Sequence, residues 1–495
     1  MREYIKIDRL DNVLVAIRDL PKGLVIEADG DRIELLDDIK GGHKIALRDI
    51  SQGENIIKYG YPIGQAKVDI LKGQWVHTHN TITNLKGTID YKYSPKLVQI
   101  AKRDGLTTFQ GYRRKNGDVG IRNELVIVPT VGCINGIGEM MLNSFKAEVN
   151  PQDLDDIRVY KHNYGCSQLG DDLENTRRIL IDIVKHPNIG GALVIGLGCE
   201  NNVIEEFIEH MGDYDESRIK FLKTQRVADE IEEGVKLLRE IYEEIRYDQR
   251  EEIPISELKI GLKCGGSDGF SGITANPLLG EFSDYLIGHG GTSILTEVPE
   301  MFGAETILME RAESEEVFKD IVKLINDFKQ YFLDHKQPIY ENPSPGNKEG
   351  GITTLEDKSL GCTQKGGKSK VVDVLQYGDV ARKKGLNLLN APGNDLVSST
   401  ALGAAGCHMV LFSTGRGTPF GSFIPTLKVS TNSKLYDLKP HWIDFNAGSL
   451  LEDKTMDELL GDFIKFVIDV ASGKLTRNEV NGFKEIAIFK TGVTL

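Results

Sequence analysis

The sequence has 495 residues, which is enough for about three domains with substantial cores. Acidic residues outnumber basic residues by 74 to 60, the formal net charge is −14, and no Lys/Arg block occurs, so we expect no nucleic-acid partner. Six cysteines make no disulfide framework, and no signal peptide or membrane-spanning run is evident. We therefore expect a cytoplasmic protein with reduced thiols and no membrane partner.

Residues 1–85 alternate short apolar runs with turn signals at roughly ten-residue spacing, which predicts a small all-β domain. The region ends in Trp75-Val76-His77-Thr78-His79-Asn80. On a strand, His77 and His79 share one face, so the pair suggests a proton-transfer or metal site. The alternative is a solvated strand end. Residues 86–110 lack periodicity and are interpreted as a linker that lets the small domain dock elsewhere.

Residues 111–250 are interpreted as a middle α/β domain. The region begins with a hairpin signal at Asn116-Gly117. Arg113 and Arg122 flank the hairpin, and their guanidinium forks suit the carboxylate of a substrate. A solvated hairpin is the alternative for at least one of them. Beyond the hairpin, strands alternate with helices, which predicts a parallel sheet.

The turns that follow these strands carry candidate metal ligands, namely His162, Cys166, Cys199 and Glu200. Right-handed crossovers place such turns at one edge of the sheet, and this mixture of ligands is typical of iron or zinc. Every cysteine of the chain adjoins a glycine: Cys133, Cys166, Cys199, Cys264, Cys362 and Cys407. We therefore predict that several of these turns converge on one site. For any single cysteine, small-residue packing is the alternative explanation.

Residues 255–495 are expected to form a C-terminal α/β domain. Its first stretch, Leu258–Pro277, predicts a buried strand, a glycine-rich turn and a helix start, as at the ligand sites of open α/β sheets. This stretch supplies one candidate metal ligand and four candidate substrate-binding residues: Cys264, then Ser267, Asp268, Thr274 and Asn276. Later glycine-rich turns add Cys362 as a ligand, and Lys365 and Arg416 as candidate substrate-binding residues.

Common nucleotide and hydrolase motifs are missing from the sequence. Gly196-Leu197-Gly198 lacks the third glycine of G-x-G-x-x-G, and the loop from Gly361 to Ser369 is one residue too long for a Walker A loop. No G-x-S-x-G elbow occurs. The remaining groups suit metal-assisted chemistry on a small polyhydroxylated anion. A metal on the carboxylate stabilises the enediolate that forms when the α-proton leaves, and histidines suit the base and acid roles in loss of a β-hydroxyl.

Short motifs are spread along the whole chain: Gly42-His43-Lys44, Val76-His77-Thr78-His79-Asn80, His162-Asn163-Tyr164-Gly165-Cys166, Gly196-Leu197-Gly198-Cys199-Glu200, Cys264-Gly265-Gly266-Ser267-Asp268, Lys358-Ser359-Leu360-Gly361-Cys362 and Thr414-Gly415-Arg416-Gly417. Together they resemble the altronate and galactarate dehydratase family. The resemblance implies a β-clip domain, a linker, a middle domain used for dimerisation and a Rossmann-like C-terminal domain. It also implies a homodimer that dehydrates a sugar acid to a 2-keto-3-deoxy acid with iron or a similar divalent metal and without nicotinamide.

The resulting hypothesis is a hydro-lyase that converts D-altronate to 2-keto-3-deoxy-D-gluconate in hexuronate catabolism. The alternatives are galactarate dehydration and a non-catalytic sugar-acid-binding regulator. We expect His77, His79 and His162 to be catalytic. We expect Fe²⁺, or Mn²⁺ in its place, to be bound by residues among Cys166, Cys199, Glu200, Cys264 and Cys362. An iron–sulfur cluster on three of these four cysteines is the less favoured alternative.

Overall fold

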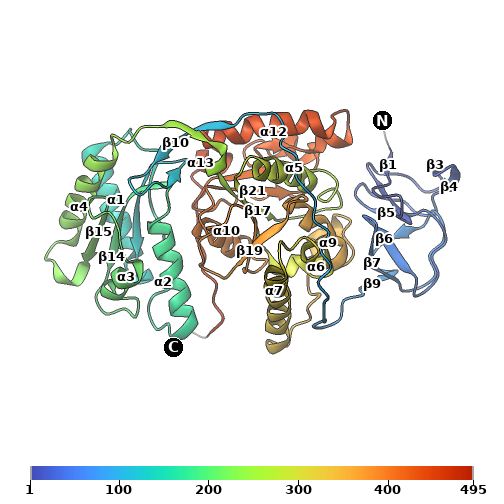
Figure 1. The fold of residues 1–495 in the computed structure, drawn as a ribbon, viewed down its shortest axis with the longest axis horizontal. Coiled ribbons are helices and arrows are strands. Elements are labelled where there is room, and N and C mark those ends of the chain that lie inside the picture. The colour runs from blue at the N-terminus through green and yellow to red at the C-terminus, as the bar shows by residue number, and fades with distance from the viewer. Residues whose placement is uncertain (1–2, 493–495) are drawn as a thin grey trace.

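The computed structural model describes residues 3–492 and shows three domains (Figure 1). Residues 1–2 and 493–495, at the outer ends of the first and last expected domains, lie outside the described residues. The C-terminal domain is central, with the small N-terminal β domain on one side and the middle domain on the other. The all-β N-terminus and the mixed α/β class confirm the predicted fold class. No helix in the described range has both the length and the apolar character needed to cross a membrane.

The N-terminal domain consists of antiparallel strands in the orders β1-β2-β5-β8, β6-β7-β9 and β3-β4. Alternate side chains such as Ile26 and Ile33 point into a small core, and the polar residues between them face solvent. Strand β8 ends at Val76, so His77 and His79 lie in the following turn and not on a strand face as expected. The strands are β1 (Tyr4–Ile5), β2 (Val13–Ala16), β3 (Val25–Ala28), β4 (Asp31–Glu34), β5 (Lys44–Ala46), β6 (Asn55–Lys58), β7 (Tyr61–Ala66), β8 (Trp75–Val76) and β9 (Thr81–Ile82).

The linker, residues 83–107, contains neither helix nor strand and runs along the C-terminal domain (Figure 1). Tyr91 holds it in place, because its hydroxyl accepts a hydrogen bond from the Lys329 ammonium at 3.1 Å. Lys329 is fully buried and also pairs with Glu305 at 2.8 Å. The linker is therefore anchored at a buried ion pair of the C-terminal domain.

The middle domain opens with the hairpin expected at Asn116-Gly117, whose strands β10 and β11 pair antiparallel. The parallel sheet β13-β12-β14-β15 follows, with α1 and α4 on one face and α2 and α3 on the other. Strands β12 and β14 are buried throughout, which accounts for their almost continuous apolar sequence. The elements are β10 (Thr108–Arg113), β11 (Val119–Gly120), β12 (Glu124–Pro129), η1 (Gly132–Ile134), α1 (Asn135–Val149), β13 (Asp156–Val159), α2 (Gly170–Val184), β14 (Ile189–Gly196), α3 (Ile204–Met211), β15 (Ile219–Lys223), η2 (Thr224–Arg226), α4 (Glu230–Ile245) and β16 (Glu251–Pro254).

The C-terminal domain is built on a seven-stranded parallel sheet in the order β19-β20-β18-β17-β21-β22-β23. The strand order runs outward in opposite directions from β17 and β21, so the topological switch point lies between these two strands. The strands are β17 (Lys259–Cys264), β18 (Thr292–Leu295), β19 (Val371–Leu375), β20 (Gly385–Leu389), β21 (Met409–Thr414), β22 (Thr426–Ser430) and β23 (Phe445–Asn446). The helices are η3 (Ile255–Glu257), α5 (Ala275–Gly288), η4 (Val298–Met301), α6 (Glu305–Met309), α7 (Glu315–Asp334), α8 (Pro345–Glu349), α9 (Leu355–Cys362), η5 (Thr363–Gly366), α10 (Asp395–Ala404), α11 (Ser433–Leu438), η6 (Gly448–Leu451), α12 (Met456–Ala471) and α13 (Arg477–Val480).

The two α/β domains share one hydrophobic core. Helix α2 packs against α10, and the residues of this core include Leu180 and Ile183 from the middle domain and Leu402 and Phe423 from the C-terminal domain. The Tyr160 hydroxyl donates a hydrogen bond to the Phe423 carbonyl across the boundary. A core that continues between the domains fixes their relative position.

A buried carboxylate holds the N-terminal domain against the C-terminal domain. The Asp357 side chain on α9 accepts from the Lys44 ammonium of β5 and the Lys58 ammonium of β6, each at 2.9 Å. All three side chains are buried, and the Thr354 hydroxyl donates to the Ile63 carbonyl beside them. Because neither ammonium has access to bulk water, docking depends strongly on this one carboxylate.

Candidate active site

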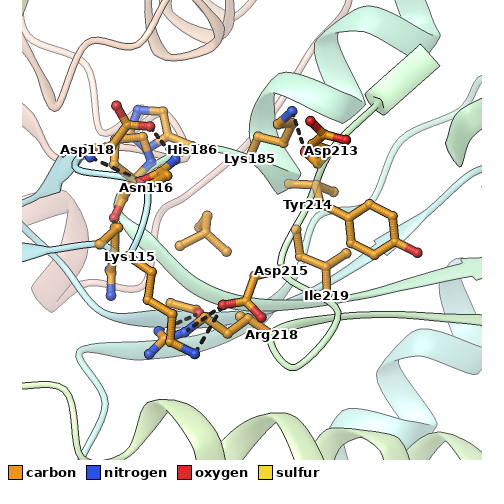
Figure 2. Close-up of a pocket in the computed structure, with 16 residues that line it drawn as sticks. Lys115, Asn116, Asp118, Lys185, His186, Asp213, Tyr214, Asp215, Arg218 and Ile219 are labelled. Atoms are coloured by element: carbon orange, nitrogen blue, oxygen red, sulfur yellow. Dashed lines mark hydrogen bonds and ion pairs between the residues drawn. The ribbon is translucent and has the colours of Figure 1, made fainter. Parts of the chain in front are cut away.

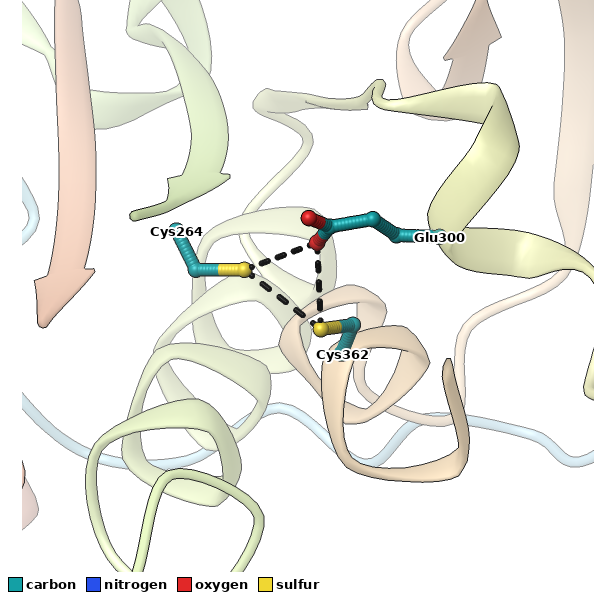
Figure 3. A group of neighbouring side chains, drawn as sticks. All are labelled: Cys264, Glu300 and Cys362. Carbon is teal, nitrogen blue, oxygen red and sulfur yellow. Dashed lines mark hydrogen bonds between the residues drawn. The ribbon is translucent and has the colours of Figure 1, made fainter. Parts of the chain in front are cut away.

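Two thiols and a carboxylate meet at the carboxyl edge of the C-terminal sheet (Figure 3). Cys264 ends β17, Glu300 lies in η4, and Cys362 ends α9. The two Sγ atoms are 3.4 Å apart, and Glu300 Oε2 lies 3.1 Å from Cys264 Sγ and 3.2 Å from Cys362 Sγ. We call these residues the thiol–carboxylate trio. Within residues 3–492, no other group of Cys, His, Asp or Glu side chains brings three ligand atoms within 4.8 Å of one another.

The fold explains why the trio forms here. Cys264 lies beside the switch point of the sheet, where helices leave the sheet in opposite directions and open a crevice. Helix α9 begins after Thr354, whose hydroxyl accepts from the Asp357 amide. This start places Lys358 and Cys362, four residues apart, on one helix face toward the trio. Glu297, just after β18, has the left-handed backbone angles φ 69° and ψ 61°, which turn the chain into η4 and bring Glu300 inward.

Three buried lysines surround the trio. The Lys358 ammonium pairs with Glu300 Oε1 at 2.7 Å, and the Lys365 ammonium lies 2.8 Å from Cys264 Sγ. Lys365 also pairs with the Glu297 carboxylate at 3.1 Å. Lys263 pairs with the same carboxylate. The site is therefore a dense, dehydrated array of opposite charges, in which the thiol of Cys264 faces an ammonium group.

The array shifts the pKa values of its members. Burial alone would raise the pKa of Glu300, but the charges of Lys358 and Lys365 outweigh it and hold this pKa below its ordinary value. Burial and the nearby Glu300 charge raise the pKa of Glu297. A hydrogen bond with Cys264, together with burial, raises the pKa of the Cys362 thiol well above its ordinary value. Lys358 remains a cation because the charge of Glu300 outweighs the effect of burial on its pKa. Glu300 is thus ionised at neutral pH, and Cys362 must lose a proton when it binds a metal.

The trio fits a thiophilic divalent cation. Around a tetrahedral ion with metal–sulfur bonds of ~2.3 Å, two thiolates lie about 3.8 Å apart, so the observed separation needs only a small expansion. Thiolates with a carboxylate are a donor set that iron and zinc both accept. The surrounding lysines offset the negative charge of such a ligand set. The residues present could therefore hold a divalent ion, and their donor set does not distinguish iron from zinc.

A cavity of about 360 Å³ opens onto two members of the trio, Cys264 and Glu300. Its wall also contains Lys358, and Asn347 in the short helix α8. The remaining polar lining consists of Glu341, Asn342, Ser344, Asn394 and Asp395. A polar cavity of this size, with a cation and several hydrogen-bonding side chains, suits a small polyhydroxylated anion.

The structure gives different roles to the four substrate-binding residues expected after Cys264. Ser267 is buried, and its hydroxyl has no hydrogen-bond partner in the protein, but the residue does not line the cavity. Asp268 accepts hydrogen bonds from Ser271 and Thr431 and fixes the loop. Thr274 and Asn276 likewise bond within the protein, to Thr431, Gly361 and Ser413. Lys365, expected to bind substrate, instead contacts Cys264 and Glu297 behind the cavity wall.

The expected arginines separate into one residue at the cavity rim and two distant ones. Arg122 is fully buried, and all its N–H donors are used by Glu479 and three backbone carbonyls, so the interpretation as a substrate anchor is wrong. Arg113 is exposed on β10 and pairs with Glu251 in the middle domain. Arg416 pairs with exposed Glu349 at 2.9 Å and packs near Gly266 of the cavity.

The expected histidines do not line the cavity. His162 is buried in the middle domain, where Nε2 contacts the Pro129 carbonyl and Nδ1 accepts from the Tyr164 amide, so both ring nitrogens have structural partners. His77 is buried against Trp75, and burial lowers its pKa to about 3, so it is neutral at physiological pH. His79 is exposed, with its ring 5.1 Å from that of Trp75. The structure therefore brings none of the three into contact with the trio.

The ligands expected from the middle domain also lie apart from the trio. Cys166 and Cys199 are exposed at the carboxyl edge of the middle sheet. Glu200 folds back on its own turn and accepts from the Thr130 hydroxyl and the Leu197 and Gly198 amides. The expected single site is therefore wrong, because the cysteine-bearing turns belong to two different parallel sheets.

A second cavity, of about 400 Å³, lies in the middle domain near the hairpin (Figure 2). Its basic side chains already have partners: Arg218 pairs with Asp215 and Asp248, and the Lys185 ammonium donates to backbone carbonyls. Its lining includes no cysteine. It offers neither a metal ligand set nor a free cation, and the cavity at the trio remains the candidate active site.

Sequence reasoning missed four charged residues of the site: Lys263, Glu297, Glu300 and Lys358. Lys358 belongs to one of the motifs described above, and its spacing of four from Cys362 was the available signal. Glu297 and Glu300 follow a strand without a distinctive motif. Their inward orientation depends on a left-handed residue that the sequence does not mark.

Three family models match the chain. They describe the altronate/galactarate dehydratase SAF domain (residues 2–84), the second domain of D-galactarate dehydratase/altronate hydrolase (residues 111–246) and the C-terminal domain of D-galactarate/altronate dehydratase (residues 255–494). The chain is 62% identical to an altronate dehydratase of Bacillus subtilis (strain 168) and 57% identical to one of Escherichia coli (strain K12), with 100% of each chain covered. It is 33% identical to the galactarate dehydratase (L-threo-forming) of E. coli (strain K12), over 95% of this chain and 93% of that relative. The chain therefore belongs to the altronate/galactarate dehydratase family.

Proposed function

We propose that this chain is a hydro-lyase that removes water from D-altronate to give 2-keto-3-deoxy-D-gluconate. The observation that carries the proposal is the polar cavity that opens onto Cys264 and Glu300. Full-length identity to the two altronate dehydratases supports altronate over galactarate, since the galactarate enzyme is much less similar. A binding-only regulator would need the cavity but not the buried thiol–carboxylate trio.

We infer that Cys264, Glu300 and Cys362 hold Fe²⁺, or Mn²⁺ in its place. Such an ion supplies a Lewis acid that stabilises negative charge developing on the substrate when its α-proton leaves. Lys358 supports the same charge, because its ammonium lies in the cavity wall and remains protonated beside Glu300. Asn347 lies in the cavity wall, and its side-chain amide donates to the Ser267 carbonyl. We propose that the buried Ser267 hydroxyl, which has no hydrogen-bond partner in the protein, binds a hydroxyl of the sugar acid.

The proposed function is tested by keto-acid release. Anaerobically prepared enzyme with Fe²⁺ is given altronate, galactarate and other aldonates or aldarates, and the keto product is trapped with semicarbazide. We expect turnover with altronate to exceed that with galactarate. Preferred turnover of galactarate would reassign the substrate. Tight binding of altronate without any keto acid would support a regulator.

We propose that Arg416 binds the carboxylate of the substrate. Its partner Glu349 is largely exposed, and an exposed ion pair is weak enough to exchange for a substrate carboxylate. Arg416→Lys keeps the charge but loses the bidentate fork, so KM should rise about tenfold, which corresponds to one charge-assisted hydrogen bond. Arg122→Lys is the matched control: it should lower the melting temperature and leave KM unchanged, because Arg122 contacts only protein groups. An unchanged KM in Arg416→Lys would exclude this role.

We propose that His79 transfers a proton during the reaction, because it is the exposed imidazole of the pair. His43 links this turn to α8, since it contacts the Glu349 carbonyl at 3.1 Å and its ring lies 5.0 Å from that of His77 in a tilted arrangement. His79→Ala should lower kcat by ~10²-fold, the lower limit for a general acid or base, without changing the melting temperature. His77→Ala should mainly destabilise the domain, because its ring packs between Trp75 and His43. Near-parental kcat in His79→Ala would assign the turn a structural role.

We further propose that the enzyme is a cytoplasmic homodimer that associates through the middle domain. The family resemblance supports this arrangement, and all six cysteines are free thiols, as expected in a reducing compartment. Sedimentation equilibrium of the full chain tests the dimer, and a monomer at micromolar concentration would contradict it.

A further inference from the structure

Three exposed thiols follow three neighbouring strands of the middle sheet. Cys133 follows β12, Cys166 follows β13 and Cys199 follows β14, and these strands are adjacent and parallel in the order β13-β12-β14. The other three cysteines of the chain are buried. Free cysteine is among the most frequently buried residue types, so three exposed thiols at one sheet edge call for a chemical explanation.

Backbone hydrogen bonds hold the three turns side by side. The Gly132 amide donates to the Tyr164 carbonyl at 2.9 Å, which joins the turns of Cys133 and Cys166. The Asn201 amide donates to the Gly165 carbonyl at 3.0 Å, which joins the turns of Cys166 and Cys199. A Cβ atom on Gly165 would lie 2.1 Å from the Thr130 carbonyl oxygen, so only glycine permits this close approach. Each bond is within two residues of a thiol, and the turns are therefore fixed as a group.

Each of the three turns leads into a helix of eight residues or more: that of Cys133 into α1, that of Cys166 into α2 and that of Cys199 into α3. The amino ends of helices carry partial positive charge, which favours an anionic group bound nearby. The Gln225 amide nitrogen also lies 3.8 Å from Cys199 Sγ. The nearby Glu200 carboxylate is occupied by its own turn.

We propose that Cys133, Cys166 and Cys199 bind a [4Fe–4S] cluster in the middle domain. A single tetrahedral ion needs thiolates about 3.8 Å apart. Within residues 3–492, only the trio brings three ligand atoms within 4.8 Å of one another, so these three cysteines do not form a site for a single ion. A cubane binds each thiolate at a different iron and so suits a wider triangle of ligands. The three thiols lose their protons on binding, and one iron receives no thiolate from this set.

The site is tested with full-length protein purified and reconstituted with iron and sulfide under argon. We expect about four acid-labile sulfides per chain and the broad visible absorption of a cubane. The triple variant Cys133→Ser, Cys166→Ser, Cys199→Ser should retain less than a tenth of the sulfide. Each single variant is measured as well, so that the test survives if the triple variant fails to fold.

Two control variants separate this site from the trio. Cys264→Ser should keep the labile sulfide, because Cys264 lies on the other sheet. Cys407→Ala, which removes a buried thiol outside both sites, should keep it as well. The proposal is overturned if the parent protein contains no labile sulfide, or if the single and triple variants retain as much as the parent. Because the readout is sulfide and not turnover, this result is independent of the proposed dehydratase activity.

Discussion

Glu300→Gln is expected to reduce kcat with altronate by at least ~10²–10³-fold and to remove most of the iron that we propose the trio binds. Glutamine keeps the volume of the side chain but removes the charge that pairs with Lys358 and faces both thiols. Changes to groups that only orient a metal ligand already cost ~10–100-fold, and loss of a ligand should cost more. The measurements are kcat under anaerobic conditions and iron content per chain after gel filtration.

The matched control for this variant is Glu305→Gln. Glu305 forms a buried pair with Lys329 at 2.8 Å, much like the pair of Glu300 with Lys358, but it does not touch the thiols. Both variants leave a buried lysine without its carboxylate partner and should lower the melting temperature. Only Glu300→Gln should lose iron and turnover. If Glu300→Gln kept its iron and a kcat near that of the parent, the trio would not be the metal site.

The fold could be predicted largely from local patterns. Continuous apolar runs such as Ala192–Gly196 gave buried parallel strands, and Asn116-Gly117 gave the hairpin turn. The arrangement of the domains was harder to predict from the sequence. That α2 packs against α10, or that Asp357 joins Lys44 and Lys58 across about 300 residues of sequence, depends on tertiary contacts that no local signal reports.

The candidate site was predicted only in part, for physical reasons. Cys264 was identifiable because ligand-bearing turns follow strands at a switch point. Cys362 was identifiable only from its glycine-flanked motif, since it ends helix α9 and does not lie in the turn that was expected. Their pairing with Glu300 depends on the left-handed backbone of Glu297, and sequence offers no sign of it. Arg122 was misassigned because a guanidinium group suits a substrate carboxylate and a buried Glu479 equally well. Sequence identifies which side chains can do chemistry, and the fold decides which of them are already occupied.

Asp357→Asn is expected to destabilise docking of the N-terminal domain by about 3–5 kcal/mol, the usual cost of removing one partner from a buried ion pair. The amide leaves the Lys44 and Lys58 ammonium groups buried without a compensating charge. Once the domain is undocked, the start of the linker should lose its contacts with Glu356, which accepts from the Thr83 hydroxyl and the Asn84 amide. Limited proteolysis at the start of the linker should therefore accelerate strongly. Loss of docking should also lower turnover, because His79 and the rest of the domain would no longer be held near α8.

The pH dependence of docking provides an independent check. Burial opposes the charge of Asp357, but Lys44 and Lys58 outweigh it and keep the pKa of this carboxyl below its ordinary value. A depressed carboxyl pKa contributes stability above the unfolded value of ~3.9, and this stability is lost as the pH falls through the folded pKa. Linker cleavage by an acid-active protease should therefore rise below about pH 4 in the parent. The Asp357→Asn variant should show the faster cleavage already at neutral pH.

Asp248→Asn is the control, because Asp248 also bridges two cations, Arg114 and Arg218, but within the middle domain. Equal linker cleavage in the two variants would show that Asp357 acts on general stability and does not fasten the N-terminal domain.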